Sequence, residues 1–414
     1  LFRLHKQSSL AKRILIYTNH YYPEQFKIND LVNWISKDDF EVRVITGLPN
    51  YPEGKIYKGY GPLSNFLSRS KNKKLKVNRL LLIPRMNGTY AILILNYISF
   101  FISCFIFTIY LAIFKKKYDI IFVHHTSPFL ISFHPIIYGL FHKTKKIIWE
   151  LDLWPDTLKG IGLIKSDTIF KLIEKVIMTT YSFYDLIMVG SKSFEKIIRK
   201  RFNKRIVYFP NWADNDIENP KKFPADLSLP KNLFKIMYAG NIGTVQNFDK
   251  LTLTINNLKN ENIHWIFVGG GRYVSDLKKI VKQNALIDNV TFISNVNIQQ
   301  IPGYSNYADC MYLSLKDSDI FKKTVPAKLQ TYMALGKPIL AVLSGEGASV
   351  IKQANCGFVN EKDDFSEFSK IVLKMSRLSE ENLNKLGKNS LNYYNRNFKS
   401  SLRKKEFFKL LNNL

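Results

Sequence analysis

At 414 residues the chain is too long for one ordinary hydrophobic core, and its 46 % hydrophobic and 14 % aromatic residues are typical of a globular protein. Subtracting 33 acidic from 61 basic residues gives a net charge of +28, which favours nucleic acid, anionic lipid headgroups or phosphorylated small molecules as partners. The three cysteines, Cys104, Cys310 and Cys356, form no CxxC pair, and an odd, scattered set is typical of a reducing compartment.

Apolar segments typical of strands alternate with helical segments from the start of the chain. The first, at 13–18, is followed by a loop and a helix, and the second begins at Phe40 and runs into a Pro/Gly-rich loop that ends at Gly54. Further strands are expected at 79–85, 118–125, 145–152, 184–191 and 205–214, with a helix at 166–182. This alternation predicts a parallel sheet with helical crossovers.

The segment 91–114 contains no charged residue and is long enough to cross a bilayer, which takes roughly 20 apolar residues. The strands on either side of it are expected in one sheet, and a single crossing would separate them. We therefore expect a helix lying in the membrane interface, with Lys115–Lys117 at headgroup level and Tyr90, Tyr97 and Tyr110 as anchors. A helical hairpin, a wholly buried helix and a true span are the alternatives.

The second half of the chain repeats the pattern after a polar, Pro-rich linker at 215–232. Strands are expected at 234–239, 263–268, 289–296 and 310–315 and from Pro338 onward, each followed by a helix. The sequence therefore predicts an α/β protein with two Rossmann-like parallel-sheet domains, at 1–214 and 233–378. The basic helical stretch 379–414 is expected to pack back on the N-terminal domain.

Three loops at strand ends of the second domain are suited to bind phosphate, because ligands of open α/β sheets bind beyond the carboxyl ends of the strands. Two loops are rich in glycine, which lets backbone N–H groups approach an anion, and the third opens a helix. The residues expected to contribute are Gly240, Asn241, Gly243, Arg272, Thr324, Pro326 and Lys328. No P-loop and no GxGxxG in the first βα turn are present, which disfavours an ATPase or a dehydrogenase.

Polar residues also follow three strands of the first half: Glu24, the pair His124 and His125, and Asp152. A histidine or carboxylate facing a cleft could orient an acceptor hydroxyl or take its proton, and the pattern does not decide which of them does so. The acidic pairs Asp214/Asp216 and Asp317/Asp319 lie in the linker or in the other half of the chain. We therefore expect no metal site and no cofactor.

Several motifs resemble the nucleotide-sugar glycosyltransferases of family 4, which have the GT-B fold. They are YYPEQFKINDL, VITGLPNYPEGKIYKGYG, ELDLWPDTLKGIG, VGSKSFEKIIRKRF, FPNWAD, MYAGNIGTVQNFDKL, FVGGGR and VPAKLQTYMALGKPILAV. They run from about residue 14 to 358, in the order of the family. More narrowly, the chain is similar to the branch of bacterial O-antigen and capsule L-fucosamine transferases.

The resemblance implies two domains facing across a cleft, with a UDP-sugar on the C-terminal domain and the acceptor on the N-terminal one. It implies that Gly240, Asn241 and Gly243 approach the donor phosphates, with Arg272 and Lys328 as cationic partners. On this basis Asn295 and Val296 lie near the uracil, Thr324 and Pro326 border the diphosphate, and His124 or His125 lies near the transferred sugar. Relatives use Arg, Lys and helix dipoles in place of a metal, usually with retention of anomeric configuration.

The function implied is a hexosyltransferase-type glycosyltransferase (EC 2.4) that moves a sugar, N-acetyl-L-fucosamine in this branch, from a UDP-sugar to a polyprenyl-diphosphate-linked saccharide in O-antigen or capsule synthesis. The enzyme would be peripheral on an anionic membrane surface, the cytoplasmic face of the bacterial inner membrane. The two glutamates of the wider family are replaced by Lys323 and Thr331, and its usual lysine by Gln246 or Asn247. A UDP-sugar 2-epimerase and a nucleic-acid-binding protein are the alternatives, although no nucleic-acid-binding module is evident.

Overall fold

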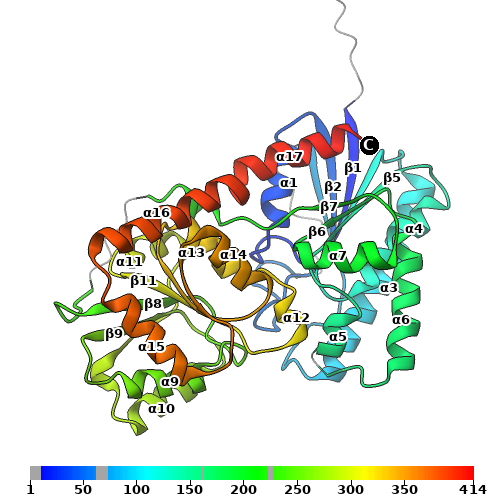
Figure 1. Ribbon diagram of the computed structural model, residues 1–414. Coiled ribbons are helices and arrows are strands. Elements are labelled where there is room, and N and C mark those ends of the chain that lie inside the picture. Colours follow the sequence, from blue (N-terminus) through cyan, green and yellow to red (C-terminus); the bar gives the residue numbers. More distant parts are fainter. Residues whose placement is uncertain (1–10, 62–72, 161, 222–226) are drawn as a thin grey trace, which may run out of the picture. The chain divides into compact units, whose positions relative to one another are not determined.

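The computed structural model describes residues 11–61, 73–160, 162–221 and 227–414 (Figure 1). The chain divides into two compact units. The first comprises the described residues up to Gly190 together with Phe194–Phe209 and Leu410–Leu414. The second comprises Ser191–Ser193 and the described residues from Pro210 to Lys409.

The first unit is built on a seven-stranded, all-parallel sheet with the order β3-β2-β1-β4-β5-β6-β7. Its strands are β1 (Lys12–Thr18), β2 (Phe40–Gly47), β3 (Leu75–Leu80), β4 (Ile120–His125), β5 (Lys145–Glu150), β6 (Leu186–Val189) and β7 (Ile206–Tyr208). The central strands are buried almost throughout, as expected for a parallel sheet covered on both faces. The predicted α/β class is confirmed.

Helices connect these strands as crossovers. They are α1 (Ile28–Ser36), α3 (Tyr90–Phe114), the 3₁₀ turn η1 (Phe129–Phe133), α4 (His134–Gly139), α5 (Asp156–Gly160), α6 (Asp167–Tyr181) and α7 (Lys192–Arg201). The strand predicted at 79–85 is displaced, because β3 pairs with β2 from Leu75 to Leu80. The chain then leaves the sheet, and the backbone of Ile83 is held by the side chains of Ser99 and Asn96 on α3.

Helix α3 packs on the first sheet along one narrow stripe. Its buried residues are Asn96, Phe100, Cys104, Thr108, Leu111 and Ala112. The opposite face exposes large apolar side chains: Tyr90, Ile94, Leu95, Ile98, Ile102, Phe105, Ile106, Tyr110, Ile113 and Phe114. By length and composition alone α3 could cross a membrane, and only 22 % of its most apolar window is buried in the chain. The wholly buried alternative therefore does not describe this helix.

The second unit has a six-stranded parallel sheet with the order β10-β9-β8-β11-β12-β13. Its strands are β8 (Phe234–Ala239), β9 (Ile263–Val268), β10 (Val290–Ile293), β11 (Cys310–Ser314), β12 (Ile339–Val342) and β13 (Gly357–Asn360). Its helical elements are α8 (Asn215–Glu218), α9 (Phe248–Asn257), α10 (Val274–Gln283), η2 (Ile287–Asn289), η3 (Ile298–Gln300), α11 (Ile301–Ser305), α12 (Asp319–Lys322), α13 (Ala327–Ala334), α14 (Glu346–Ala354), α15 (Phe365–Ser376) and α16 (Glu380–Asn397). A hydrophobic cluster lies on each face of this sheet.

The C-terminal stretch 379–414 forms α16 and α17 (Ser400–Asn412). Helix α16 packs against α13 and α14 within the second unit, and the last residues, Leu410–Leu414, belong to the first unit. The Tyr394 hydroxyl of α16 donates to the carboxylate of Glu218, and Ser400 donates to the same carboxylate. The segment expected as a linker therefore contains α8, whose last residue is tied to the C-terminal helices.

Candidate active site

The carboxyl ends of β1, β4 and β5 bring several predicted polar residues of the first unit together. His124 and His125 are successive residues of β4, so their side chains point to opposite faces of the sheet. His124 lies beside Thr18 of β1 and Trp149 of β5, whereas His125 lies beside Glu150. The two histidines therefore belong to two different clusters.

His124 is buried and neutral. Its Nδ1 lies 2.9 Å from the Thr18 hydroxyl, and its buried Nε2 finds no hydrogen-bond partner in the described part of the chain. Burial is the main cause that lowers the pKa of His124 to about 3, and the neighbouring His20 and His125 contribute to this shift. A group with that pKa is a weak base but a good neutral hydrogen-bonding group for a hydroxyl.

His125 is part of a closed network. Its Nδ1 is hydrogen-bonded to a carboxylate oxygen of Glu150, whose other oxygen accepts a hydrogen bond of 2.6 Å from the Tyr181 hydroxyl. All three side chains are fully buried, and the rings of Phe129 and Trp154 pack edge-on against the imidazole. This arrangement holds β4, β5 and α6 together, and it leaves only the buried Nε2 of His125 without a partner among the described residues.

Glu24 is buried beneath the Pro/Gly-rich loop that follows β2. One of its carboxylate oxygens accepts from the backbone N–H of Asn50 at 2.8 Å and from that of Tyr51 at 2.7 Å. The other oxygen lies 2.8 Å from Nδ1 of His20. Glu24 is thus a positioning residue, because it orders the loop and a neighbouring histidine while being only 2 % exposed.

His20 was missed by the sequence-based prediction, although it follows β1 just as His124 and His125 end β4. An Arg85 Nη2 lies 3.2 Å from Nε2 of His20, and because a guanidinium can only donate, Nε2 accepts and Nδ1 carries the proton given to Glu24. Burial lowers the pKa of His20, Glu24 opposes that shift, and Arg85 adds to it. Phe26 stacks on His20 at 4.5 Å and meets His124 edge-on, which joins them in one cluster.

Asp152 lies near the second cluster and also orders a loop. Its carboxylate accepts from the backbone N–H of Ser127 at 2.9 Å, and the Ser127 hydroxyl accepts from the indole of Trp154 at 2.9 Å. The loop that follows β4 is therefore fastened to the loop that follows β5.

In the second unit the two glycine-rich loops, 240–243 and 269–271, pack against each other. A side chain on Gly269 would meet the carbonyl oxygen of Gly240 at 2.2 Å, and one on Gly271 would meet that of Ile242 at 2.2 Å. The N–H of Gly240 donates to Val268, and that of Gly243 to the Gln246 side chain at 2.9 Å. Close packing thus accounts for these glycines, and the amides of Gly240 and Gly243 are already used inside the protein.

Lys328 from α13 lies directly over this loop. Its Cε is 2.6 Å from where a Cβ on Gly240 would stand, and its ammonium lies 5.4 Å from the centre of the Tyr238 ring. Partial burial lowers the pKa of Lys328, and within the described ranges its ammonium has no ion pair or hydrogen bond. A desolvated cation without a carboxylate partner is poised to receive an anionic ligand.

The other predicted donor-site residues lie around the same strand ends. Asn295 touches the second glycine loop, since a Cβ on Gly270 would come 2.8 Å from its side-chain amide. Arg272 is exposed at the end of that loop, and the exposed Asn241 accepts from the Tyr238 hydroxyl through its carbonyl at 2.6 Å. Val296 packs on the core, Thr324 donates to the Phe321 carbonyl at 3.0 Å, and Pro326 is the residue before α13.

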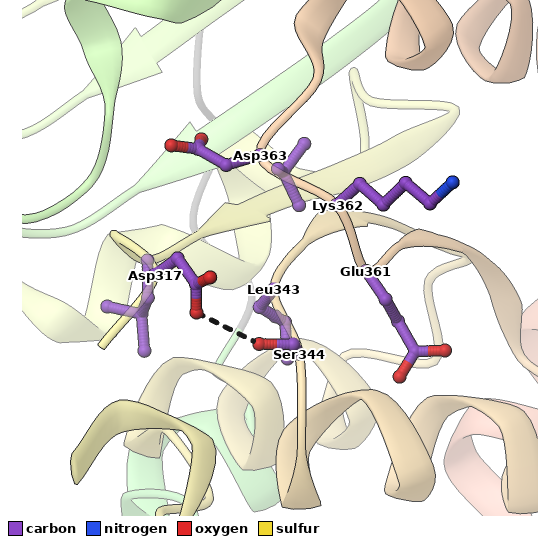
Figure 2. Close-up of a pocket in the computed structure, with 8 residues that line it drawn as sticks. Asp317, Leu343, Ser344, Glu361, Lys362 and Asp363 are labelled. Atoms are coloured by element: carbon purple, nitrogen blue, oxygen red, sulfur yellow. Dashed lines mark hydrogen bonds between the residues drawn. The ribbon is translucent and has the colours of Figure 1, made fainter. Parts of the chain in front are cut away.

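A small pocket lies beyond the ends of β11, β12 and β13. It is lined in part by Asp317, Ser344, Glu361 and Asp363 (Figure 2). Asp317 receives a hydrogen bond from Ser344 and forms an ion pair of 2.8 Å with Lys322. The pocket has a volume of about 10 Å³, room for roughly one water molecule, so it is too small for a sugar.

The second unit matches the family model described as Glycosyl transferases group 1 over residues 219–393. Among curated proteins, WcaI of Escherichia coli K12, whose name places it in colanic acid biosynthesis, is 26 % identical over 360 residues, covering 82 % of this chain and 85 % of WcaI. WbjE of Pseudomonas aeruginosa, named as a glycosyltransferase, is 23 % identical over 291 residues, covering 67 % and 70 % of the two chains.

Solved structures show the same two-sheet architecture. A sucrose-phosphate synthase from Thermosynechococcus elongatus superposes with a TM-score of 0.73 at 15 % identity, covering 97 % of this chain and 98 % of the other. HepE of Anabaena, solved in complex with UDP, superposes with a TM-score of 0.67 at 12 % identity, covering 97 % of this chain and 100 % of HepE. WaaG, a glycosyltransferase involved in lipopolysaccharide biosynthesis, superposes with a TM-score of 0.65 at 13 % identity, covering 95 % of this chain and 98 % of WaaG.

Two parallel-sheet units of seven and six strands with these likenesses define the GT-B fold, as the sequence predicted. The protein is an enzyme, a glycosyltransferase, and residues 219–393 match the group 1 family model. Both predictions, of the fold and of the enzyme class, are confirmed.

Proposed function

We propose that the enzyme transfers a sugar from a UDP-sugar to a saccharide carried on polyprenyl diphosphate, in the synthesis of a cell-surface polysaccharide. Two relatives support the pathway, since WcaI is named for colanic acid biosynthesis and WaaG for lipopolysaccharide biosynthesis. The donor class is supported by HepE, which was solved in complex with UDP. N-acetyl-L-fucosamine, in O-antigen or capsule synthesis, is proposed as the sugar from the resemblance in sequence.

The observation that carries this proposal is the ammonium of Lys328 above Gly240, which has no ion-pair partner in the part of the chain that the structure describes. A UDP leaving group develops negative charge as the glycosidic bond breaks, and a preoriented cation stabilises that charge. Arg272, exposed on the neighbouring loop, would supply a second, forked donor to the diphosphate. With these cations we propose that transfer is metal-independent.

The exposed apolar face of α3 supports a membrane-bound acceptor. A 25-residue apolar helix, followed directly by Lys115–Lys117, matches an interfacial helix on an anionic membrane surface. The enzyme would then be peripheral on the cytoplasmic face of the bacterial inner membrane, where polyprenyl-linked acceptors are held. Neither a 2-epimerase nor a nucleic-acid-binding protein would need such a helix, and the comparisons favour neither.

The test is direct transfer. Purified protein is incubated with EDTA, a panel of UDP-sugars and a short polyprenyl-diphosphate N-acetylglucosamine acceptor, and the acceptor is examined for added sugar mass. We expect a product with one donor and EDTA present. A strict requirement for added Mg²⁺ would contradict metal independence, and UDP binding without any product from any donor would contradict the proposed acceptor.

Variants then test the site. Lys328→Ala and Arg272→Ala should reduce transfer at fixed donor concentration, because each removes a proposed diphosphate contact. Lys279→Ala is the matched control, since this exposed lysine lies on α10, away from the glycine loops, and removes the same charge. If all three variants transferred equally well, the proposed donor site would be wrong.

A further inference from the structure

A cationic pocket lies at the amino-terminal ends of β1, β2 and β3, at the opposite end of the sheet from the histidine clusters. Its volume is about 80 Å³, room for several waters, since one water needs roughly 10–15 Å³. The charged residues that line it are Arg13, Glu41, Arg43, Lys73, Lys74 and Lys76. Five cations against one carboxylate leave an excess of four positive charges in the lining.

Arg13 is held in place on one side of the pocket. Its Nε lies 3.2 Å from Glu41, its Nη1 donates to the Lys117 carbonyl at 2.7 Å, and its guanidinium stacks on the Tyr118 ring at 4.5 Å. The backbone N–H of Arg13 also donates to Asp119 at 2.8 Å. The guanidinium is therefore oriented before any ligand arrives.

Arg43 is oriented in the same way but is less completely paired. Its Nη1 donates to the side chain of Asn78 at 2.8 Å, while its buried Nε has no hydrogen-bond partner in the residues that the structure describes. Lys74 forms an ion pair of 3.0 Å with the exposed Asp39, whereas Lys73 and Lys76 are exposed at the rim. Arg43 also has no carboxylate partner among the described residues, so an anion in the pocket could balance its charge.

The pocket is on the same face of the sheet as α3. Side chains alternate along a strand, so Arg13 shares a face with Tyr17, whose hydroxyl lies 3.0 Å from that of Thr108 on α3. The register pairs Leu15 with Arg43 and Arg43 with Lys76, which puts both on that face. Helix α3 ends at Phe114, and the three lysines after it lead to the carbonyl of Lys117 that Arg13 binds.

We propose that this pocket binds the phosphate group of an anionic membrane lipid such as phosphatidylglycerol. The guanidinium fork fits two phosphate oxygens, and the lysines add point charges. The lipid is favoured over a free phosphate because the pocket adjoins the end of the apolar helix, at the level where headgroups would lie. The inference rests on the proposed contact of α3 with the membrane.

The experiment measures binding of the full chain to vesicles of phosphatidylcholine alone and of phosphatidylcholine with phosphatidylglycerol, at constant ionic strength. We expect at least about fivefold tighter binding to the mixed vesicles, the gain expected from one cation near the surface. Arg43→Lys preserves the charge but removes the fork, so it should lose most of that gain. Arg13→Lys is a second test should the first variant fail to fold, and Arg396→Lys, the same change at an exposed arginine on α16 of the second unit, is the matched control.

The outcomes separate the pocket from the membrane contact. In one outcome, wild type binds both kinds of vesicle, and Arg43→Lys and Arg13→Lys bind the mixed vesicles as tightly as wild type does. The attraction between protein and anionic lipid is then diffuse, and the pocket proposal is overturned. If inorganic phosphate binds in an Arg43-dependent manner while the lipid gain is unaffected, the ligand is a free phosphate and the lipid assignment is overturned. If wild type binds neither vesicle, the proposed membrane contact itself fails, whatever the transfer assay shows.

Discussion

Lys328 lies over Gly240 so closely that a single added carbon on the glycine would come within 2.6 Å of the lysine Cε. Gly240 lies in the loop after β8 and Lys328 in the first turn of α13, and the lysine ammonium has no carboxylate partner within the ranges described. This geometry makes the lysine the strongest candidate for an anion contact in the second unit.

Replacing this lysine should weaken nucleotide binding while leaving the fold intact. Because a hydrogen bond to a charged group contributes about 1.5–3 kcal/mol, Lys328→Met is expected to lower UDP affinity about 10- to 100-fold. Calorimetric titration with UDP measures the effect. The melting temperature without ligand should not fall, since a desolvated charge is removed.

The pH dependence provides a control on this interpretation. The lowered pKa of Lys328 means that its ammonium loses a proton at lower pH than an ordinary lysine, so UDP affinity should decline as the pH rises toward the alkaline range. Lys328→Met should abolish that decline. Equal alkaline losses in wild type and variant would assign the titration to another group.

Contact between the glycine loops predicts a large loss of stability in Gly269→Ala. A side chain there meets a backbone oxygen at 2.2 Å, and φ is +136°. Strain and overpacking together are expected to lower the free energy of unfolding by about 2–4 kcal/mol. Denaturant unfolding measures the loss, with Gly61→Ala as the control because no atom of the described residues lies within 4 Å of its added carbon. A stable Gly269→Ala would show that the loops can separate.

Two substitutions at Glu24 distinguish its contact with the loop after β2 from its contact with His20. Glu24→Ala leaves two backbone N–H groups and His20 without their acceptor and is expected to lower the free energy of unfolding by about 2–4 kcal/mol. Glu24→Gln keeps an oxygen for the backbone groups but turns an NH₂ toward the protonated Nδ1 of His20. It should lose less stability than Glu24→Ala and still lose transfer activity, because two N–H donors then face each other. Full activity would show that transfer does not depend on His20.

The buried histidines predict a loss of stability in acid. His124 has a pKa of about 3 in the fold against roughly 6.5 when unfolded, so the unfolded chain binds the extra proton. Stability from this group is complete above pH 6.5 and falls by about 1.4 kcal/mol per pH unit down to about pH 3. His20 acts in the same direction.

Denaturant unfolding at pH 7.5 and pH 5 tests this prediction. His124→Asn should show a smaller difference between the two pH values than wild type does. His142→Asn, at a less buried histidine of the same unit, is the control that distinguishes the effect of His124 from a general effect of acid. An unchanged difference in His124→Asn would mean that this histidine is not the group that titrates.

The proposed membrane contact predicts which face of α3 is sensitive to charge. Ile102→Lys with Ile106→Lys should move the enzyme from the membrane to the soluble fraction, because both side chains are more than half exposed and point away from the sheet. Leu253→Lys with Ile287→Lys adds the same charge to exposed apolar positions of the second unit and should leave fractionation unchanged. Identical fractionation of both pairs would argue against insertion of α3.

The periodicity of apolar segments was enough to predict the parallel sheets, because buried strands such as β6 and β12 are wholly apolar. It misplaced β3, since that edge strand is partly polar and the more apolar residues after it, near Ile83, contact α3 instead. Local pattern also could not show that the amides of Gly240 and Gly243 are occupied, or that Glu24 faces inward. Those facts depend on contacts between residues far apart in the chain.

The order in which the strands are made adds a constraint on α3. Strand β4 pairs with β1 near the middle of the sheet, yet it follows α3 in the chain and so leaves the ribosome after the apolar helix. A nascent chain whose α3 crossed a bilayer would place β4 on the far side, where β1 could not reach it. Completion of the sheet therefore acts as a check on topology, because only a chain that keeps both ends of α3 on one side can finish folding.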